Sequence, residues 1–592
     1  MIMKKVMFLS MLCASFLLTA GCTSDNDDWE DYGWTPDNNS QQANGSSSTS
    51  AAATGELTSF EIAIDKTTAE PTTTVSEYFP DEEDDLAANS FATEVSIVFN
   101  GSTATCSAAD GVTISADGAH VVADHGTTKG ICYNVSGTTS NGSLTIVGSK
   151  KYEVKLNGAN ITNPDSTALN LLSSKRAYLV LADGTTNQLA DGTTSKASDQ
   201  KAALYCKGKL LVNGSGSLEV YGNYNNAIGC ADYIVFRTGN NIYAKSTANH
   251  GIKANDGIFI NGGILNIEVS AAAAKGINCE SNIIVNGGRT TILTTGNGTY
   301  DSEDSEVKGS AGIKCDSVYT QNGGEVYLKS TGSGGKGLKA DWEAYMNGGK
   351  LYVITEGAQY RYNNDTASPK GIKVGTKSVH GVLEFNGGTT MVRTKGTNGE
   401  GIESKGTLTV SDGTVQVAAY DDGINAAGNL TVKGGSITSV GTNSDGLDSN
   451  GNLYIQGGTI VAFGAGGAES GIDAGEQYKL YITGGNIFGI GGRIDANLGS
   501  TSQGIVSTSG SVTANSTVSV SNGSSVIASF TMPPYSYNNG TILLSTPSMS
   551  NGSSYTLNLG STTQTVTASS SISSSMGGGS MPGGGGGRPG GW

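Results

Sequence analysis

The sequence predicts an all-β chain built mainly as a right-handed parallel β-helix, in which short strands wind into stacked coils. Two landmarks recur along the chain at similar spacing, and the residues between them alternate between apolar and polar. Charged residues make up only 15% of the 592 residues, whereas glycine numbers 87. That composition favours strands joined by tight turns over helices.

The first landmark is a glycine followed by isoleucine or leucine, a variable residue and a small residue, as in Gly276-Ile277-Asn278-Cys279. Its glycines are Gly251, Gly276, Gly312, Gly337, Gly371, Gly401, Gly423, Gly446 and Gly471. They follow one another in steps of 25, 36, 25, 34, 30, 22, 23 and 25 residues. A period in the low twenties is typical of a solenoid.

The second landmark is Asn-Gly-Gly, which begins at Asn261, Asn286, Asn322, Asn347 and Asn386. Glycine adopts the positive φ that a sharp corner needs, so each coil is expected to bend at this point. Asn-Gly is also a hairpin signal, which makes a β-sandwich the rival fold. The fixed phase of the two landmarks favours coils stacked in register.

The N-terminus has the parts of a secretory signal peptide. Two lysines precede an apolar run over residues 6–18, which is too short to span a membrane, and Thr19-Ala20-Gly21-Cys22 follows. This ending resembles a bacterial lipobox, which implies cleavage after residue 21 and lipidation of Cys22. The acidic residues 23–28 resemble an export signal of surface lipoproteins. We therefore expect a lipid anchor at the outer membrane, on the cell surface.

The remaining segments follow in order along the chain. Residues 22–55, rich in Ser, Asn and Ala, are predicted to be a flexible tether. Residues 56–135 are predicted to form a β region that leads into the first coils and covers their open edge. The β-helix is placed at 136–498, a small antiparallel β module at 499–574, and a disordered glycine-rich tail at 575–592.

The cysteines after the lipobox are spaced without any CxxC pair, so no zinc or redox site is indicated. They are Cys106, Cys132, Cys206, Cys230, Cys279 and Cys315. Cys206 and Cys230 fall in one inward column of successive coils, as do Cys279 and Cys315. Disulfides between coils are one possibility, and free buried thiols that pack as small apolar groups are the favoured one.

If the isoleucine of each coil points inward, the next residue points to solvent and forms an exposed column. That column contains Lys253, Asn278, Lys314, Lys339, Lys373, Glu403, Asn425, Asp448 and Asp473. The residues before the glycines divide in the same way, with His250, Lys275, Lys336 and Lys370 early and Glu400, Asp421, Asp422, Asp445 and Glu469 late. A basic patch and an acidic patch are predicted.

The basic patch is the candidate carbohydrate-binding surface. Its lysines Lys253, Lys314, Lys339 and Lys373 can pair with the carboxylates of an acidic polysaccharide. One of them can instead act as the general base of a β-elimination if its pKa is lowered. The alternative is a face of lysines that serves only solubility.

Aromatic side chains are expected beside this surface. Two long steps of the repeat insert loops that carry Tyr300, Tyr360 and Tyr362, and Trp342 lies next to the column. Flat aromatic rings stack on the apolar faces of sugars, so we assign Trp342, Tyr360 and Tyr362 to carbohydrate binding. Ordinary packing within the loops is the alternative.

The acidic patch is the candidate metal site. Stacked carboxylates repel one another, and a bound cation removes that penalty. Oxygen ligands from adjacent coils suit calcium, and the candidates are Glu400, Glu403, Asp421, Asp422, Asp445 and Asp448. No EF-hand loop is present, and a solvated acidic edge is the alternative.

The net charge limits the kinds of partner that the chain is expected to bind. The chain carries 52 acidic against 35 basic side chains, a formal charge of −17. This charge repels phosphate backbones, so nucleic acid is excluded as a partner. We expect a monomer that meets a polysaccharide, with the lipid anchor as its contact with the membrane.

Several strings together resemble a known family. They are Tyr152-Glu153-Val154-Lys155-Leu156-Asn157-Gly158-Ala159-Asn160-Ile161, Leu181-Ala182-Asp183-Gly184-Thr185-Thr186-Asn187-Gln188-Leu189, the Gly-Ile-Lys coils, and Asp421-Asp422-Gly423-Ile424. Over residues 90–495 the chain resembles the bacterial β-helical carbohydrate-binding domain, which is related in fold to family nine pectate lyases. The resemblance implies binding of cellulose or acidic pectic sugars, and bound calcium.

Three functions remain after these arguments. The first is a surface lipoprotein that binds cellulose-like or acidic pectic glycans on the side of a calcium-stabilised β-helix. The second is a polysaccharide lyase that acts on pectate, and the third is a structural or adhesive surface protein. A fold shared with lyases does not carry over their chemistry, so we favour binding over catalysis.

Overall fold

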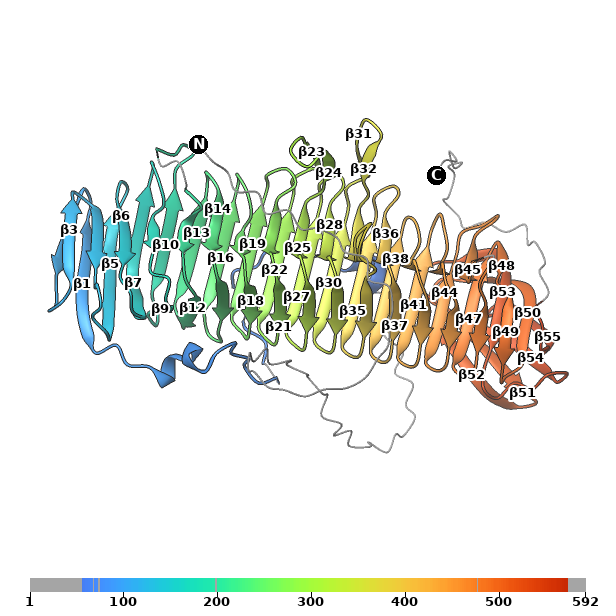
Figure 1. Ribbon diagram of the computed structural model, residues 1–592. Coiled ribbons are helices and arrows are strands. Elements are labelled where there is room, and N and C mark those ends of the chain that lie inside the picture. Colours follow the sequence, from blue (N-terminus) through green and yellow to red (C-terminus); the bar gives the residue numbers. More distant parts are fainter. Residues whose placement is uncertain (1–55, 68, 73–74, 197–199, 476, 573–592) are drawn as a thin grey trace, which may run out of the picture. The chain divides into compact units, whose positions relative to one another are not determined.

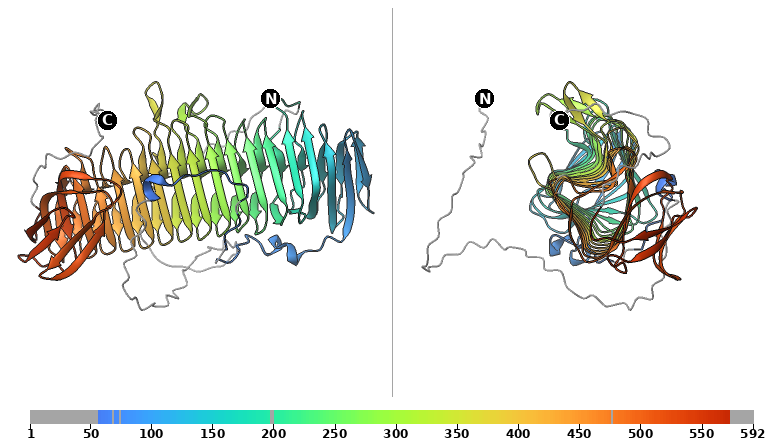
Figure 2. Two further views of the ribbon diagram at one scale, coloured as in Figure 1. Left: turned by 180° about the vertical axis from the view of Figure 1, so that it is seen from behind. Right: turned by 90° about the vertical axis from the view of Figure 1, so that its right-hand side faces the viewer.

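A computed structural model describes residues 56–67, 69–72, 75–196, 200–475 and 477–572. It contains a 31-stranded sheet and a 16-stranded sheet, and most strands pair in parallel with the equivalent strand one coil away. The predicted parallel β-helix is confirmed. Figure 1 shows the coils following one another in sequence order, and the right-hand view of Figure 2 looks along them.

Each coil has three faces. Face 1 is the 16-stranded sheet, and faces 2 and 3 are two ladders of the 31-stranded sheet. The strands of face 1 are β3 (Thr113–Asp117), β4 (His120–Asp124), β6 (Ser143–Val147), β8 (Leu169–Leu171), β11 (Ala202–Cys206), β14 (Asn226–Cys230), β17 (Ile252–Ala254), β20 (Lys275–Cys279), β25 (Ala311–Cys315), β28 (Lys336–Ala340), β33 (Lys370–Val374), β36 (Glu400–Ser404), β39 (Ile424–Ala426), β42 (Leu447–Ser449), β45 (Ser470–Asp473) and β48 (Arg493–Asp495).

Face 2 follows face 1 along each coil. Its strands are β9 (Ala177–Leu181), β12 (Leu210–Gly214), β15 (Tyr233–Phe236), β18 (Gly257–Ile260), β21 (Asn282–Val285), β26 (Val318–Gln321), β29 (Glu343–Met346), β34 (Val382–Phe385), β37 (Thr407–Val410), β40 (Leu430–Val432), β43 (Leu453–Ile455), β46 (Leu480–Ile482) and β49 (Leu498–Thr501).

Face 3 closes the coil. Its strands are β1 (Thr93–Asn100), β5 (Ile131–Thr139), β7 (Tyr152–Asn163), β10 (Thr186–Asp191), β13 (Ser217–Gly222), β16 (Asn241–Ser246), β19 (Ile264–Val269), β22 (Arg289–Thr294), β27 (Glu325–Ser330), β30 (Lys350–Thr355), β35 (Thr389–Thr394), β38 (Thr414–Ala419), β41 (Ser436–Gly441), β44 (Thr459–Phe463) and β47 (Asn486–Gly491). Strand β7 runs across two faces, because its first half pairs with β9 and its second half with β10. At the N-terminal end β2 (Thr103–Ser107) pairs antiparallel with β1.

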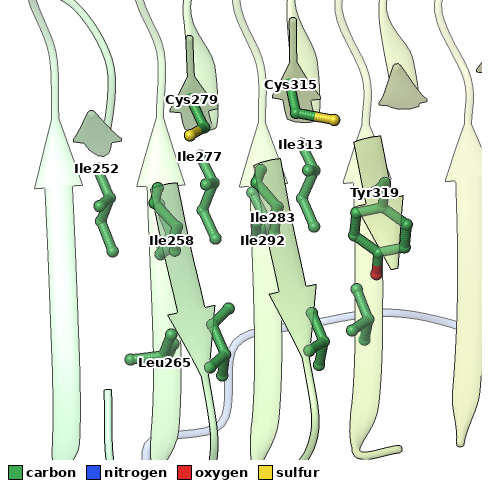
Figure 3. Close-up of a cluster of buried hydrophobic side chains, with 14 of the residues drawn as sticks. Ile252, Ile258, Leu265, Ile277, Cys279, Ile283, Ile292, Ile313, Cys315 and Tyr319 are labelled. Carbon is green, nitrogen blue, oxygen red and sulfur yellow. The ribbon is translucent and has the colours of Figure 1, made fainter. Parts of the chain in front are cut away.

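The interior is filled by columns of apolar side chains. Ile252, Ile277 and Ile313 of face 1 lie over one another in register, and none of them is exposed. Figure 3 shows this column with Cys279 and Cys315 beside it. Full burial of one such aliphatic side chain stabilises the fold by about 1.5–3 kcal/mol. The six cysteines within the described residues are free thiols.

The Asn-Gly-Gly corners lie between faces 2 and 3, and the second glycine has a positive φ, +71° at Gly288. The asparagine side chains also bind one another from coil to coil. The Asn286 amide donates to Asn261 at 2.9 Å, and Asn322, Asn347 and Asn386 extend the ladder with bonds of 2.9, 2.9 and 3.0 Å. The corner landmark therefore supplies both the turn and a column of hydrogen bonds.

The segment 56–92, here called the N-terminal strap, forms no strand in its described part, which corrects the β region expected from residue 56. It contains α1 (Glu56–Ser59) and the 3-10 turns η1 (Glu82–Asp84) and η2 (Leu86–Ala88). It lies across the coils from Arg393 back to Arg176, and Tyr78 caps the asparagine ladder at Asn261. No helix in the described part of the chain has the length and apolar character to cross a membrane.

The C-terminal region covers the last coils. Strand β53 (Tyr537–Ser545) pairs antiparallel with β47 and with β50 (Ile505–Val512). A separate four-stranded antiparallel sheet consists of β51 (Thr517–Asn522), β52 (Ser525–Thr531), β54 (Ser554–Asn558) and β55 (Thr563–Thr567). Phe488 of face 3 packs against Phe530 of this sheet, with ring centres 5.8 Å apart. Apolar residues that face outward on the last coils are thereby buried.

Candidate functional site

The glycine of each coil creates two outward columns on face 1. A Cβ at Gly276 would lie 2.1 Å from Cγ2 of Ile292 and 2.7 Å from the oxygen of Gly312, so this position faces the interior and admits no side chain. Ile277 also faces the interior. The residue before the glycine and the residue after the isoleucine therefore both face outward, and we call their columns the upstream and the downstream column.

The register of face 1 places the downstream column as the spacing predicts. Lys253 pairs with Asn278, which is followed by Lys314, Lys339, Lys373, Glu403, Asn425, Asp448 and Asp473 in successive coils. Strand pairing thus brings the four predicted lysines into one column.

These four lysines are paired with carboxylates, which stand either two residues after the lysine or in the next coil. The Nζ of Lys253 lies 2.8 Å from Glu280, that of Lys339 lies 2.9 Å from Asp341, and that of Lys373 lies 3.3 Å from Glu403. Lys314 contacts Asp316, and its Nζ is 3.4 Å from Asp341. The downstream lysines are therefore largely neutralised, which weakens their assignment as the anion-binding groups.

The upstream column contains two lysines of a different kind, Lys275 and Lys336, with Ala311 between them in the register. Their ammonium groups contact only carbonyl oxygens, those of Ala273 and, at 3.2 Å, Gly334. Neither has a carboxylate within 4.0 Å in the described part of the chain. Burial and the neighbouring lysines lower the pKa of Lys275 to about 8 and that of Lys336 to about 7.

At three other positions of the upstream column the side chain accepts a hydrogen bond from the backbone of the next coil. Nδ1 of His250 accepts from the N–H of Lys275 at 3.0 Å, and Asp422 and Asp445 accept from the N–H groups of Asp445 and Ser470 at 3.0 and 2.5 Å. Asp422 and Asp445 are buried rather than solvated. Each of these two aspartates therefore has one oxygen engaged in holding adjacent coils together.

The acidic end of face 1 carries carboxylates under strong mutual repulsion. Burial and the neighbouring aspartates raise the pKa of Asp445 to about 9 and that of Asp448 to about 8. For Asp473, burial and Asp495 raise the pKa to about 6. The set of oxygen donors suits a hard cation such as calcium. However, no group of three or more His, Cys, Asp or Glu side chains is arranged to hold a metal ion within the described ranges.

Two of the predicted metal ligands belong to a lysine cluster instead. The Nζ of Lys370 lies 2.6 Å from Glu400 and 3.6 Å from Glu403, and Lys405 lies 2.5 Å from Glu403. Although burial opposes ionisation, these ammonium groups and Lys373 keep the pKa of Glu403 low. Three ammonium groups around Glu403 repel a cation, so Glu400 and Glu403 fit a metal site poorly. Asp421 precedes Asp422 in the same turn.

The two inserted loops form hairpins that stand together beside the upstream column. They are β23 (Thr299–Asp301) with β24 (Glu306–Lys308), and β31 (Tyr360–Tyr362) with β32 (Asp365–Ala367), and both project on the same side in Figure 1. The Val307 N–H donates to Asp365 at 2.6 Å. The rings of Tyr300 and Tyr362 stack with centres 4.3 Å apart, and Tyr362 is 43% exposed. The hairpins thus offer an exposed aromatic platform.

The other predicted aromatic residues occupy different places. Tyr360 packs against the glycine backbone, because a Cβ at Gly298 would lie 2.8 Å from its ring. Trp342 is 56% exposed and follows β28, so it lies at the opposite edge of face 1 from the hairpins. Cys22, the predicted lipidation site, lies outside the described residues. Tyr362 and Trp342 therefore border the two columns on opposite sides.

Comparison with known proteins gives three findings. A family described as carbohydrate-binding domain-containing protein matches residues 117–272, 267–357 and 379–542, which together exceed half of the chain. A curated protein of Acetivibrio thermocellus with the same description is 30% identical over 157 residues, 25% of this chain and 52% of that protein. The chain thus spans about half the length of that relative.

The third finding is a solved structure, a polysaccharide lyase-like protein from C. thermocellum in a gadolinium derivative. The alignment covers 61% of this chain and 97% of the solved chain, with 17% sequence identity and a TM-score of 0.25. A score this low adds nothing to the fold established by the strand pairing above.

Proposed function

Because the chain belongs to the family of carbohydrate-binding domain-containing proteins, we propose that it binds an acidic polysaccharide along the outer surface of face 1. The single observation that supports this choice is the pair Lys275 and Lys336, whose ammonium groups lack a carboxylate partner in the described chain. A cellulose-like glycan, without charge, would leave both ammonium groups uncompensated.

The geometry of this pair suits a carboxylate. Lys275 and Lys336 lie two coils apart, roughly 9.5 Å at the usual spacing of strands. The coil between them carries Ala311, whose side chain ends at Cβ. Ala311 itself is buried, so a sugar carboxylate has to approach the two ammonium groups from the outer side of Lys275 and Lys336. Burial is the main cause of both lowered pKa values and the neighbouring lysines add to it, and a negative charge beside the pair opposes both effects and so favours binding.

The aromatic platform supplies the second element of recognition. The ring of Tyr362 is exposed at the end of the β31–β32 hairpin, and it stacks on the ring of Tyr300. An aromatic ring covers the apolar face of a pyranose, while the lysines bind its carboxylate. Charge and ring stacking together select an acidic glycan over a neutral one.

Retention on immobilised polygalacturonate tests the proposal. The double variant Lys275→Gln and Lys336→Gln is expected to lose at least tenfold in affinity. The control Lys350→Gln removes a lysine of face 3 that pairs with Glu325 at 3.0 Å, and it should bind as the parent does. Equal retention of all three proteins, or stronger binding to a neutral glucan, would refute acidic binding along face 1.

Calcium is a second part of the proposal. We propose that a calcium ion binds at the acidic end through free carboxylate oxygens of Asp445 and Asp448, with water or glycan oxygens as its remaining ligands, because no three carboxylates of the described residues are arranged around one point. The raised pKa values in this cluster support the placement, because burial is their main cause and repulsion between carboxylates adds to it, and a bound cation offsets both. Relief of this kind stabilises the last coils, away from the lysine pair.

A polysaccharide lyase is the second candidate, favoured by the lowered pKa of Lys336. An amine with a pKa of about 7 is partly neutral at physiological pH and can abstract the proton next to a sugar carboxylate. Polygalacturonate treated with the protein would then gain ultraviolet absorbance from unsaturated sugar ends. If that signal is absent and the protein still binds polygalacturonate, the lyase function is refuted and binding remains as the function.

We also propose attachment to the cell surface through lipidated Cys22, on the basis of the N-terminal sequence. Metabolic labelling with a fatty acid should mark the parent chain and not Cys22→Ser. If the protein is labelled but retained by no glycan, a structural or adhesive role at the surface takes precedence over carbohydrate binding.

A further inference from the structure

A pocket of about 410 Å³ lies far from the lysine pair, on the outer side of face 3. Three segments that are distant in sequence form its walls. Thr58 and Glu61 come from the strap, Arg393 and Tyr420 from the ends of β35 and β38, and Tyr535 from the loop before β53. Pockets of this size hold small ligands such as one sugar unit.

The floor of the pocket exists because one residue of face 3 is small. Ala418 faces outward between Arg393 and Val440 of the neighbouring coils, and it is buried against Leu57 and Met391. A larger side chain at this position would occupy the space above the strand. The pocket therefore depends on the small side chain of Ala418 in β38.

The charges around the pocket are already balanced. The guanidinium of Arg393 donates to Glu61 at 2.8 Å and to the carbonyl oxygen of Phe60 at 2.7 Å. The Nζ of Lys395 lies 2.8 Å from Glu356. An anionic ligand would have to compete with these carboxylates, so the pocket favours an uncharged ligand.

Polar groups nevertheless remain available to a ligand. Arg393 is 7% exposed, and within the described residues its buried Nε–H has no acceptor. Burial raises the pKa of Tyr535, whose phenol therefore stays protonated and can donate. Tyr420 and Tyr535 are half-buried and contribute ring surface. A buried donor without a partner costs free energy that a ligand oxygen recovers.

We propose that this pocket binds a single uncharged pyranose unit, as a free sugar or as the end of a glycan. A pyranose has an apolar face for Tyr535 and several hydroxyl oxygens, one of which can accept from the covered Arg393 Nε–H after a small shift of the pocket walls. The site is distinct from the acidic-glycan surface of face 1, and it draws on the proposed function only for the general class of ligand.

Calorimetry and saturation-transfer NMR on the full chain test the pocket, with methyl glycosides of glucose, galactose, mannose and xylose as probes. At least one is expected to bind with one site per chain. Ala418→Phe, which fills the pocket, and Tyr535→Ala, which removes a half-buried wall, should each weaken binding at least tenfold. Ala418→Ser keeps the space and should bind as the parent does.

The two proposals fail separately in this design. The double variant Lys275→Gln and Lys336→Gln should no longer bind polygalacturonate but should still bind the neutral glycoside. Ala418→Phe should still bind polygalacturonate but should no longer bind the neutral glycoside. Binding of no neutral glycoside, or binding that persists in both Ala418→Phe and Tyr535→Ala, would overturn the pocket proposal. Preferential binding of methyl galacturonoside at the pocket would also overturn it.

Discussion

The hydroxyl of Tyr233 on β15 lies 2.8 and 2.7 Å from the two carboxylate oxygens of Asp84, a fully buried residue of the N-terminal strap. The Nε of Arg176 donates to the same carboxylate at 2.8 Å. A buried carboxylate is stable only with such partners, so this contact anchors the strap to the coils.

Replacement of Asp84 by Asn is expected to release the strap locally. Loss of one partner of a buried ion pair costs about 3 kcal/mol, which corresponds to roughly a hundredfold faster opening. Hydrogen exchange should therefore rise at residues 77–92 and stay unchanged in the coils. Glu82→Gln, an exposed neighbour, is the control. Unchanged exchange in Asp84→Asn would show that the anchor is dispensable.

The affinity for polygalacturonate should depend on pH through Lys336. Because burial and neighbouring lysines lower its pKa to about 7, the side chain is charged at pH 6 and mostly neutral at pH 8. Affinity should fall several-fold between these values in retention or calorimetric measurements. Lys336→Gln should bind more weakly at pH 6 and lose most of this dependence. A flat profile in the parent contradicts the assigned role.

Stability in chelator should fall as pH rises, because of the acidic end of face 1. Asp445 and Asp448 have folded-state pKa values of about 9 and 8, above the unfolded values near 4. Their contribution is therefore fully present below pH 4 and is lost progressively up to pH 9. Tm should be lower at pH 8 than at pH 5, and Asp445→Asn should reduce the difference.

Calcium should reverse this loss. At pH 8 the ion is expected to raise Tm by several degrees, whereas at pH 5 protonated aspartates leave little to gain. Magnesium, which demands a stricter geometry, is the control ion. If calcium has the same effect at both values, the aspartates of the acidic end are not its site.

Gly276→Ala should destabilise the coils. Its Cβ would lie 2.1 Å from Ile292 and 2.7 Å from the oxygen of Gly312, and overpacking of this kind costs about 1–3 kcal/mol. Chemical denaturation gives the value. Ile292→Ala in the same chain removes the nearer contact and should recover part of the loss. Additive effects of the two changes would contradict a direct clash.

The coil and its outward column could be predicted from sequence because each depends on short periodic strings. Gly276-Ile277-Asn278-Cys279 fixes its own register, and Lys314 falls above Asn278 because Gly312-Ile313-Lys314-Cys315 repeats the same motif. The partners of Lys314 and Lys339 were missed because Asp341 lies just outside the periodic string Gly337-Leu338-Lys339-Ala340. The burial that distinguishes Lys275 and Lys336 from the other lysines arises only in three dimensions, and the spacing of the repeat does not reveal it. The sequence predicted only that both lysines, which precede a glycine, belong to a basic patch.

The course of the strap could not be predicted at all. Phe60-Glu61-Ile62-Ala63-Ile64 alternates as a strand does, yet its polar partners Lys329 and Arg393 come from distant coils. A local pattern carries no information about such partners. For the same reason, the pocket between Thr58, Ala418 and Tyr535 has no signature in the sequence.

The position of the strap sets an order of folding. Its residues leave the ribosome before the coils that it contacts, because Glu61 binds Arg393, which is 332 positions later in the chain. Contacts between such distant residues form slowly, whereas neighbouring coils associate through short loops. Docking of the strap at Arg393 therefore requires that the coil containing β35 has already formed.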